Sequence, residues 1–194
     1  DIATSTWDTS GPVRLYLNSG DGRFIERTSE AGLSGILGGL NLVGADYDND
    51  GDVDLLVLRG GWLQAAGREH PNSLLQNDGK GRFRDVTFAV GLAGEGLDFP
   101  TQTAAWADFD NDGDLDLYVG NEGFDGQLFR NDNGHFIDIA PEAGVDGAGV
   151  VKGTAWGDYD NDGDEDLYVS VRGGANRLYR NDGTGRFEDV AAEL

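Results

Sequence analysis

Aspartate dominates three nine-residue segments of this sequence, residues 46–54, 108–116 and 158–166, and each reads Asp-aromatic-Asp-Asn-Asp-Gly-Asp-x-Asp. Five carboxylates this close together repel one another strongly unless a cation lies among them. Oxygen ligands at alternate positions suit a hard divalent ion, and calcium fits best because it accepts about six to eight oxygens in flexible geometry. The sequence therefore predicts three calcium sites. The alternative interpretation, which a single copy would allow, is an acidic turn exposed to solvent.

The candidate ligands are the aspartates at loop positions 1, 3, 5, 7 and 9. They are Asp46, Asp48, Asp50, Asp52 and Asp54 in the first loop, Asp108, Asp110, Asp112, Asp114 and Asp116 in the second, and Asp158, Asp160, Asp162, Asp164 and Asp166 in the third. Position 6 is glycine in each copy, which permits the positive φ that a tight wrap around an ion needs. Position 7 is expected to offer its backbone carbonyl, which leaves its side chain free.

The loops do not belong to EF-hands. An EF-hand needs a glutamate at position 12 and a helix on each side. Position 12 here is Val57, Val119 or Val169, and each valine lies in a short apolar run that is typical of a strand. The segments upstream of the second and third loops, 104–107 and 154–157, are also short and apolar. Each acidic loop is therefore predicted to join two strands.

Composition limits the functions that this chain can have. Its 194 residues suit a single domain, and 36 acidic residues against 14 Lys and Arg give a formal charge of −22. Three bound Ca²⁺ ions would cancel only six of those charges, so we expect neither nucleic acid nor direct membrane insertion. Cysteine and methionine are absent, and no apolar run is long enough to span a membrane. The missing cysteines fit an exported protein, and the missing methionine indicates a processed or partial chain.

A second motif alternates with the first and defines a repeat. Each copy is a short strand, a turn of Asn, Asp and Gly, and a Gly-x-Phe segment, and the copies end at Phe24, Phe83, Phe136 and Phe187. Four strands (A to D) in a repeat of about 50 residues indicate the blades of a β-propeller. We therefore predict an all-β fold with calcium loops between strands A and B. The expected units are a partial blade (strands B–D) at 1–38 and full blades at 39–100, 101–149 and 150–194.

Two tryptophans and two histidines stand out within the repeats. Trp106 and Trp156 occupy the same place on strand A, and we expect both to pack between blades. His70 and His135 lie at different repeat positions without a partner motif, so they are interpreted as ordinary loop residues.

The two motifs, Asp-x-Asp-x-Asp-Gly-x-x-Asp and Leu-Tyr-Arg-Asn-Asp-Gly-x-Gly-x-Phe, together resemble the FG-GAP/VCBS repeats of integrin-α-like propellers. The resemblance is closest to CRTAC1/ASPIC-type proteins and spans nearly the whole chain. It implies a seven-bladed ring in which calcium is structural and the calcium loops lie opposite the ligand face. It leaves function open, because such propellers serve adhesion, lectin-like binding or scaffolding, and some belong to polysaccharide-degrading enzymes.

The loops between strands B and C vary from repeat to repeat, and they hold the candidate ligand-binding residues Trp7, Trp62, Phe124 and Arg172. Exposed aromatics on glycine-rich loops suit a sugar or a protein partner, although such a ring can also pack on its own blade. We predict an exported, calcium-stabilised binding or adhesion module for a glycan or protein. The alternatives are the propeller portion of a polysaccharide-degrading enzyme and a structural component of an extracellular assembly. No catalytic residues are expected in this chain.

The repeat alignment also predicts an incomplete ring. Asp1 takes the place of position 9 of a calcium loop, and the last blade offers no spare strand to complete the first. The remaining blades are expected from the same polypeptide, with a partner chain as the alternative source.

Overall fold

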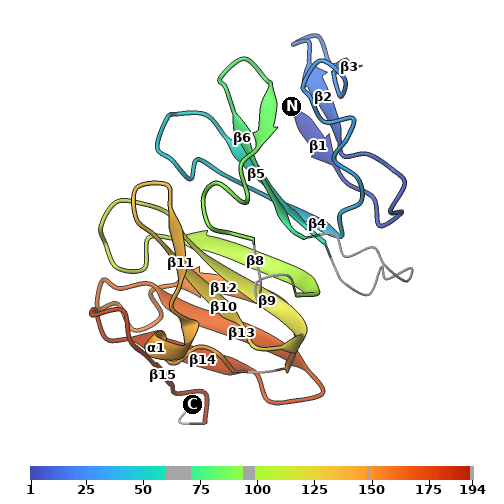
Figure 1. Ribbon diagram of the computed structural model, residues 1–194. Helices are drawn as coiled ribbons and strands as arrows, with labels where there is room; N and C mark the ends of the chain where they lie inside the picture. Colours follow the sequence, from blue (N-terminus) through green and yellow to red (C-terminus); the bar gives the residue numbers. More distant parts are fainter. Residues whose placement is uncertain (60–70, 94–98, 148, 193–194) are drawn as a thin grey trace.

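The computed structural model describes residues 1–59, 71–93, 99–147 and 149–192. Within these ranges the chain forms fifteen strands and one short helix. Figure 1 shows how these elements are arranged. The strands are β1 (Ile2–Thr4), β2 (Arg14–Asn18), β3 (Phe24–Glu26), β4 (Asn41–Ala45), β5 (Asp54–Leu58), β6 (Ser73–Asn77), β7 (Phe83–Asp85), β8 (Thr101–Ala107), β9 (Asp116–Phe124), β10 (Gln127–Asn131), β11 (Phe136–Asp138), β12 (Gly149–Gly157), β13 (Asp166–Arg172), β14 (Arg177–Asn181) and β15 (Phe187–Asp189). The chain is therefore all-β, as predicted.

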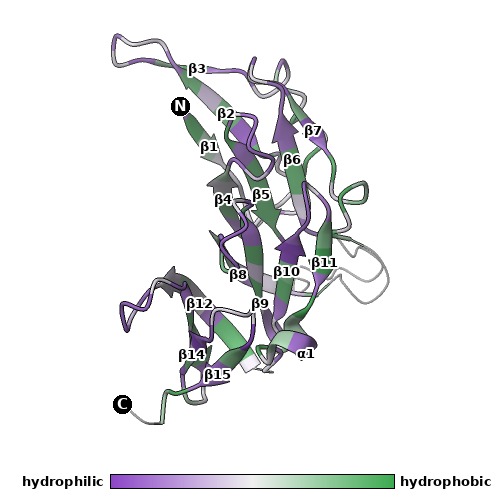
Figure 2. Cartoon of the chain, turned by 90° about the vertical axis from the view of Figure 1, so that its left-hand side faces the viewer, coloured by the Kyte–Doolittle hydropathy of each residue, from purple (hydrophilic) through white to green (hydrophobic). Residues whose placement is uncertain are grey.

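The strands form four antiparallel blades in chain order. The first blade is β1-β2-β3, the second is β4-β5-β6-β7, the third is β8-β9-β10-β11 and the fourth is β12-β13-β14-β15. The blades follow one another along an arc, and in the second and third blades the strands step outward from one side of it (Figure 2). The A–B loops of the second to fourth blades project on one side of Figure 1, and the B–C connections of the first, third and fourth blades lie on the other. This is the β-propeller arrangement that the repeat predicts.

The hydrophobic core lies between the blades, because alternate residues of a strand face opposite sides of its sheet. In β5, Leu56 and Leu58 join a cluster with the third blade, whereas Val57 joins a cluster with the first blade. A third cluster, which includes Leu128 and Leu167, joins the third and fourth blades. All five side chains are at most 2% exposed. Each blade is therefore stabilised mainly by its two neighbours in the sequence.

Both strand A tryptophans pack between blades, as predicted. Trp106 packs against the cluster that the second and third blades share, and its ring lies 5.9 Å from Phe136 of its own blade. The ring of Trp156 lies 6.3 Å from Phe109 of the third blade and 6.0 Å from Phe187 of its own. The indole Nε1 of Trp156 also donates a hydrogen bond of 3.1 Å across the interface to the carbonyl of Ala105. These rings fix the spacing of the blades and so the spacing of the acidic loops that follow them.

Two features of the fold were not predicted from the sequence. Helix α1 (Ala140–Ala143) follows β11 as a single helical turn and ends where Gly144 adopts a φ of 82°. The third and fourth blades also pair directly, because the end of β9 hydrogen-bonds the start of β12 through Phe124 with Gly149 and Glu122 with Val150. This pairing makes one continuous eight-stranded sheet. Among the described residues, no helix is long and apolar enough to cross a membrane.

Candidate functional site

The backbone of each acidic loop wraps around the carboxylate at position 1. In the second loop the two oxygens of Asp108 accept hydrogen bonds of 3.0 Å from the amides of Asp112 and Gly113. The same pair of bonds measures 3.0 Å in the first loop and 3.1 Å in the third. The glycine at position 6 has a φ between 93° and 99° in the three loops, which confirms the predicted positive φ.

The asparagine at position 4 has a role that the sequence analysis missed. Asn49, Asn111 and Asn161 adopt φ values of 57°, 59° and 62°, in the left-handed region that asparagine tolerates better than most residues. The sequence does carry a signal for this role, because the same asparagine stands at position 4 of all three loops. A left-handed residue followed by the position 6 glycine lets the loop turn back on itself.

Carboxylate oxygens converge in each loop. One oxygen from each member of a group lies within 4.8 Å of the others, and the groups are Asp46, Asp48 and Asp50; Asp108, Asp110 and Asp116; and Asp158, Asp160 and Asp166. Two oxygens on opposite sides of a calcium ion are about 4.6–5.2 Å apart, twice the usual Ca–O distance. Each group is therefore compact enough to surround one such ion.

Two of these groups contain an oxygen that no protein group satisfies. Oδ1 of Asp48 and Oδ1 of Asp110 are buried, and neither has a hydrogen-bond partner within the described part of the chain. A buried acceptor without a partner costs about 1–3 kcal/mol, and more when it is charged. The position 3 carboxylates thus fit a bound hard cation, which would take these free oxygens as ligands.

The aspartate at position 9 is the most deeply buried of the five. Asp116 is fully buried, and its two oxygens accept the amides of Asn131 at 2.8 Å and Phe109 at 3.2 Å. Burial raises the pKa of Asp116 to about 8 and that of Asp54 to about 6, and neighbouring carboxylates add to the rise. A cation in the loop would favour the ionised form of both groups. Asp1 accepts the amide of Asn18 at 2.8 Å, the bond that its alignment with position 9 predicts.

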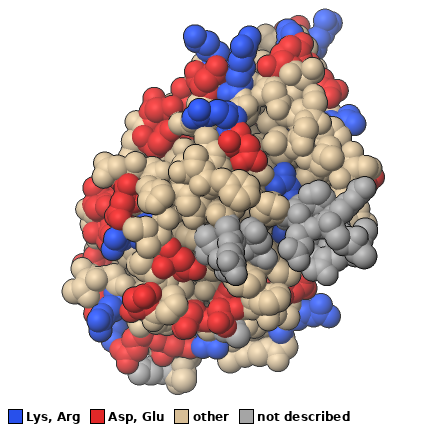
Figure 3. Space-filling view, in the orientation of Figure 1, with Lys and Arg blue, Asp and Glu red and all other residues tan. Residues whose placement is uncertain are grey.

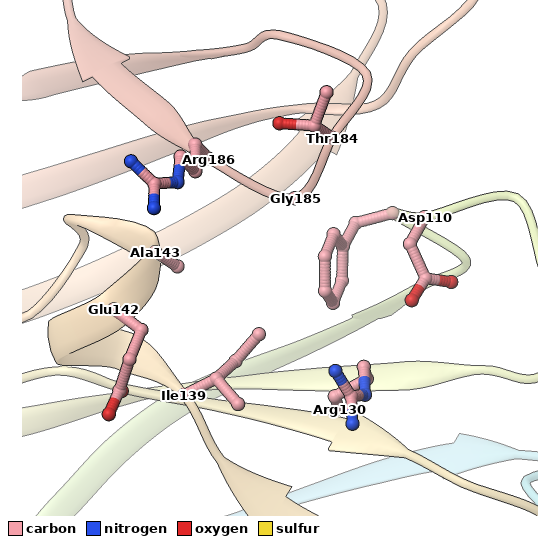
Figure 4. Close-up of a pocket in the computed structure, with 9 residues that line it drawn as sticks. Asp110, Arg130, Ile139, Glu142, Ala143, Thr184, Gly185 and Arg186 are labelled. Atoms are coloured by element: carbon pink, nitrogen blue, oxygen red, sulfur yellow. The ribbon is translucent and has the colours of Figure 1, made fainter.

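Side chains on strand C support the position 3 carboxylates from outside the loop. Gln76 donates a hydrogen bond of 2.6 Å from Nε2 to Oδ2 of Asp48. Arg130, at the equivalent position of the third blade, opposes the rise that burial causes in the pKa of Asp110. Figure 4 shows Arg130 and Asp110 facing the same pocket of about 290 Å³, together with Glu142 and Arg186. The guanidinium of Arg130 itself pairs with Asp132 at 3.0 Å, so the loop carboxylates keep most of their negative charge.

The position 7 side chains contact the preceding loop, and the prediction that they stay free is wrong for two of the three. Oδ1 of Asp114 accepts a hydrogen bond of 3.0 Å from Nδ2 of Asn49, whose Nδ2 also lies 3.1 Å from the carbonyl of Gly113. Oδ1 of Asp164 accepts one of 2.9 Å from Nδ2 of Asn111. Neighbouring acidic loops are thus joined directly, position 4 to position 7. The carbonyl role of position 7 stays a prediction.

The asparagine that ends strand C is a second residue whose role the sequence analysis missed. Nδ2 of Asn131 donates to the carbonyl of Tyr47 in the preceding acidic loop at 2.9 Å and to that of Leu115 at 3.1 Å. Asn181 repeats this arrangement with Phe109 at 2.8 Å. Asn131 and Asn181 are at most 1% exposed. The repeated Asn of the second motif was interpreted as a turn residue, whereas it joins each blade to the loop before it.

The third acidic loop is more open than the other two. The aromatic at position 2 is 3% exposed at Tyr47 and 1% exposed at Phe109, but 39% exposed at Tyr159. Asp158 and Asp160 are exposed as well, whereas Asp46 and Asp108 are half-buried. The difference arises because the first two loops are covered by the blade that follows each of them.

The candidate ligand-binding residues lie at the opposite end of the strands from the acidic loops, as predicted. Trp7 follows β1 and is 67% exposed, Phe124 ends β9 and is 45% exposed, and Arg172 ends β13 and is exposed. Phe124 stacks on Phe99 with ring centroids 4.8 Å apart, so its ring packs partly on its own blade. Trp62 lies outside the described residues. In Figure 3, carboxylates gather along the left margin, where Figure 1 places the acidic loops.

Of the two histidines, the structure describes only His135. His135 is exposed in the turn between β10 and β11, where its carbonyl accepts the amide of Asp132 at 2.8 Å. His70 lies outside the described residues.

Comparison with known proteins identifies the repeat. A family model described as FG-GAP-like repeat matches residues 1–57, 63–119 and 108–169. Cartilage acidic protein 1 of Xenopus tropicalis is 31% identical over 129 residues, which cover 62% of this chain and 18% of that protein. The human protein of the same name is 32% identical over 116 residues, which cover 58% of this chain and 16% of that protein. The chain thus spans less than a fifth of these relatives.

A solved structure shares the fold. It is an Agrocybe aegerita lectin, described for its specific recognition of non-reducing terminal N-acetylglucosamine. The TM-score is 0.53 at 20% sequence identity, over 96% of this chain and 50% of the lectin. The repeated acidic loops, the four-stranded blades and the match to the family model all indicate the same kind of repeat. The chain belongs to the FG-GAP-like repeat family.

Proposed function

We propose that this chain is part of an exported, calcium-stabilised β-propeller that binds a glycan or a protein through the face opposite its calcium loops. The observation that supports calcium binding is the convergence of carboxylates in three loops. Two of these loops contain a buried oxygen that has no hydrogen-bond partner among the residues that the structure describes. A bound Ca²⁺ would supply positive charge and oxygen coordination, and so hold each A–B turn closed. The aspartates at positions 1, 3, 5 and 9 would hold it with their side chains, and Asp52, Asp114 and Asp164 with their carbonyls.

The binding role is supported by the contrast between the two ends of the strands. The acidic loops repeat almost residue for residue, whereas the B–C connections differ in every blade and present exposed Trp7, Phe124 and Arg172. Loops that vary on a rigid scaffold are the usual place for recognition. The similar lectin recognises a terminal sugar, which favours a glycan over a protein as the ligand of this chain.

Export is supported by the composition. The chain has no cysteine, and extracellular calcium modules bind at about 0.1–1 mM, which matches calcium outside cells rather than inside them. The charge of −22 argues against nucleic acid and anionic lipid as partners.

The units of this proposal are one partial blade at 1–38 and three full blades at 39–100, 101–149 and 150–194, all within one propeller. The strand order of the sheets supports this division.

Two experiments test the proposal: calorimetry measures calcium binding, and a glycan array measures ligand binding. We expect three calcium sites per chain, and binding of at least one glycan class in 2 mM CaCl2 (~0.1–1 mM sites being largely filled) that is lost in excess EGTA. Asp108→Asn should remove one site, and Glu188→Gln, on an outer strand, is the matched control. Failure to bind calcium at millimolar concentration would refute the proposal. Turnover of an acidic polysaccharide would instead support the enzyme alternative.

A further inference from the structure

Two β-bulges place polar side chains at the end of the strands opposite the acidic loops. The register of β8 on β9 shifts between Thr101 and Thr103, and that of β12 on β13 shifts between Val151 and Gly153. Gln102 and Lys152 are therefore the extra residues of two bulges at equivalent repeat positions, each four residues before the strand A tryptophan. Bulges redirect a side chain and are frequent next to binding sites.

The bulged residues meet a third polar side chain. Nζ of Lys152 donates to Oε1 of Gln102 and lies 3.3 Å from Oε1 of Glu122, while Nε2 of Gln102 donates a hydrogen bond of 2.9 Å to Oε2 of Glu122. The three residues come from β8, β9 and β12, and so from both blades of the continuous sheet. The side chains of Lys152 and Glu122 are 33% and 26% exposed, so solvent reaches them. The cluster carries no net charge.

An aromatic pair adjoins this cluster. Phe124 lies two residues beyond Glu122 and stacks on Phe99, with an interplanar angle of 27° and 45% of Phe124 exposed. The amide of Glu122 donates a hydrogen bond of 2.7 Å to the carbonyl of Pro100, the residue after Phe99. This backbone bond joins the segment that holds Phe99 to the strand end that holds Glu122 and Phe124.

The residues of this cluster do not follow the structural repeat. Glu122 lies six residues after a position 9 aspartate, and the residues at the same distance in the fourth and first blades are Arg172 and Trp7. The buried asparagines that join blades, Asn131 and Asn181, keep one residue type. The position of Glu122 changes from Glu to Arg to Trp, so the repeat does not fix its residue type.

We propose that Gln102, Glu122 and Lys152, with the Phe99–Phe124 pair, form a binding site for a neutral saccharide. A sugar hydroxyl both donates and accepts hydrogen bonds, and a carboxylate beside an ammonium and an amide offers partners for both. The exposed ring of Phe124 suits the apolar face of a pyranose. Glu122 and the charge of −22 oppose an anionic ligand. This inference rests on the proposed function and names its ligand class and site.

The test uses the full chain in millimolar CaCl2 on an array of neutral and acidic glycans, followed by calorimetry with the best neutral oligosaccharide. Glu122→Gln, Lys152→Met and Phe124→Ala should each weaken binding about tenfold or more, because each removes a charged hydrogen bond or the stacking face. Glu188→Gln removes a comparable exposed carboxylate, 3.0 Å from Arg180, and should leave the affinity within about twofold. Melting curves identify any variant that loses the fold, and Phe124→Leu replaces Phe124→Ala if that variant does.

The outcomes separate this inference from the proposed function. Loss of neutral glycan binding in folded variants, with the control unchanged, supports both. Binding that the variants leave unchanged overturns the site and keeps the proposed function. Binding confined to acidic glycans or to protein overturns the ligand class and likewise keeps that function. A chain that binds calcium but neither glycan nor protein overturns both.

Discussion

Calcium removal should destabilise this chain by an amount comparable to the stability of an ordinary domain. Each of the three acidic clusters suits one ion, and a ligand that binds only the folded state stabilises it by RT ln(1 + [L]/Kd). With Kd about 0.1–1 mM and calcium at about 10 mM, each site contributes roughly 1.4–2.7 kcal/mol. Three sites together contribute about 4–8 kcal/mol, against typical unfolding free energies of about 5–15 kcal/mol. For a chain of this size that corresponds to a melting temperature lowered by about 10–30 °C.

The assay is thermal unfolding followed by circular dichroism, in excess calcium and in excess EGTA. Magnesium at the same concentration is the control for ionic strength, because it demands near-octahedral geometry at about 2.0–2.1 Å and so should stabilise less. Asp108→Asn should remove about a third of the calcium effect. Identical melting curves with calcium and with EGTA would show that the carboxylates are ordinary solvated side chains and would refute the reasoning.

Three comparisons test the contacts between blades, each by chemical denaturation. Asn131→Ala should lower the free energy of unfolding by about 2–3 kcal/mol, because it leaves two carbonyls without their donor, one in the preceding acidic loop and one in the loop of its own blade. An effect below about 0.5 kcal/mol would contradict this. Trp156→Phe should lower the free energy of unfolding by about 1 kcal/mol more than Trp106→Phe does. The reason is that Nε1 of Trp156 has a hydrogen-bond partner, whereas the buried Nε1 of Trp106 has none among the described residues. Equal losses of unfolding free energy in the two variants would argue against this reasoning. Asp114→Ala should lower the free energy of unfolding by about 1–3 kcal/mol. Asp52→Ala is the control, because the carboxylate of Asp52 accepts no hydrogen bond within the described ranges, and it should change stability by less than about 0.5 kcal/mol. The reverse order would count against the interblade bond.

Much of the fold could be predicted from the sequence because the blade repeats. Three or four copies of one pattern fix which residues alternate between faces, so the strands, the loop conformation and the two interblade tryptophans were all predictable. Contacts between repeats were not, because a pattern within one repeat does not show what the next repeat places against it. The bond from Asn49 to Asp114 joins residues 65 apart, and the one from Asn131 to Tyr47 joins residues 84 apart.

Arg59 is a further residue whose environment could not be predicted from the sequence. The sequence placed it in a glycine-rich connection, where an arginine is normally solvated. The structure buries it to 6% exposure, and burial lowers its pKa. Its guanidinium donates to the carbonyls of Leu37 and Pro71 and to the hydroxyl of Ser73. The three acceptors come from segments that are distant in the sequence, and together they satisfy the buried guanidinium. No pattern of neighbouring residues predicts such a set of contacts.

The cover over each acidic loop comes from the blade that follows it, and this gives the chain a direction of assembly. Tyr47 and Asn49 reach their partners only when the third blade is in place, and Phe109 and Asn111 only when the fourth is. During synthesis the N-terminal blades form first. Each loop therefore reaches its final burial only after the next blade has been synthesised. Burial of the acidic loops thus follows chain growth with a delay of one repeat, about 50 residues.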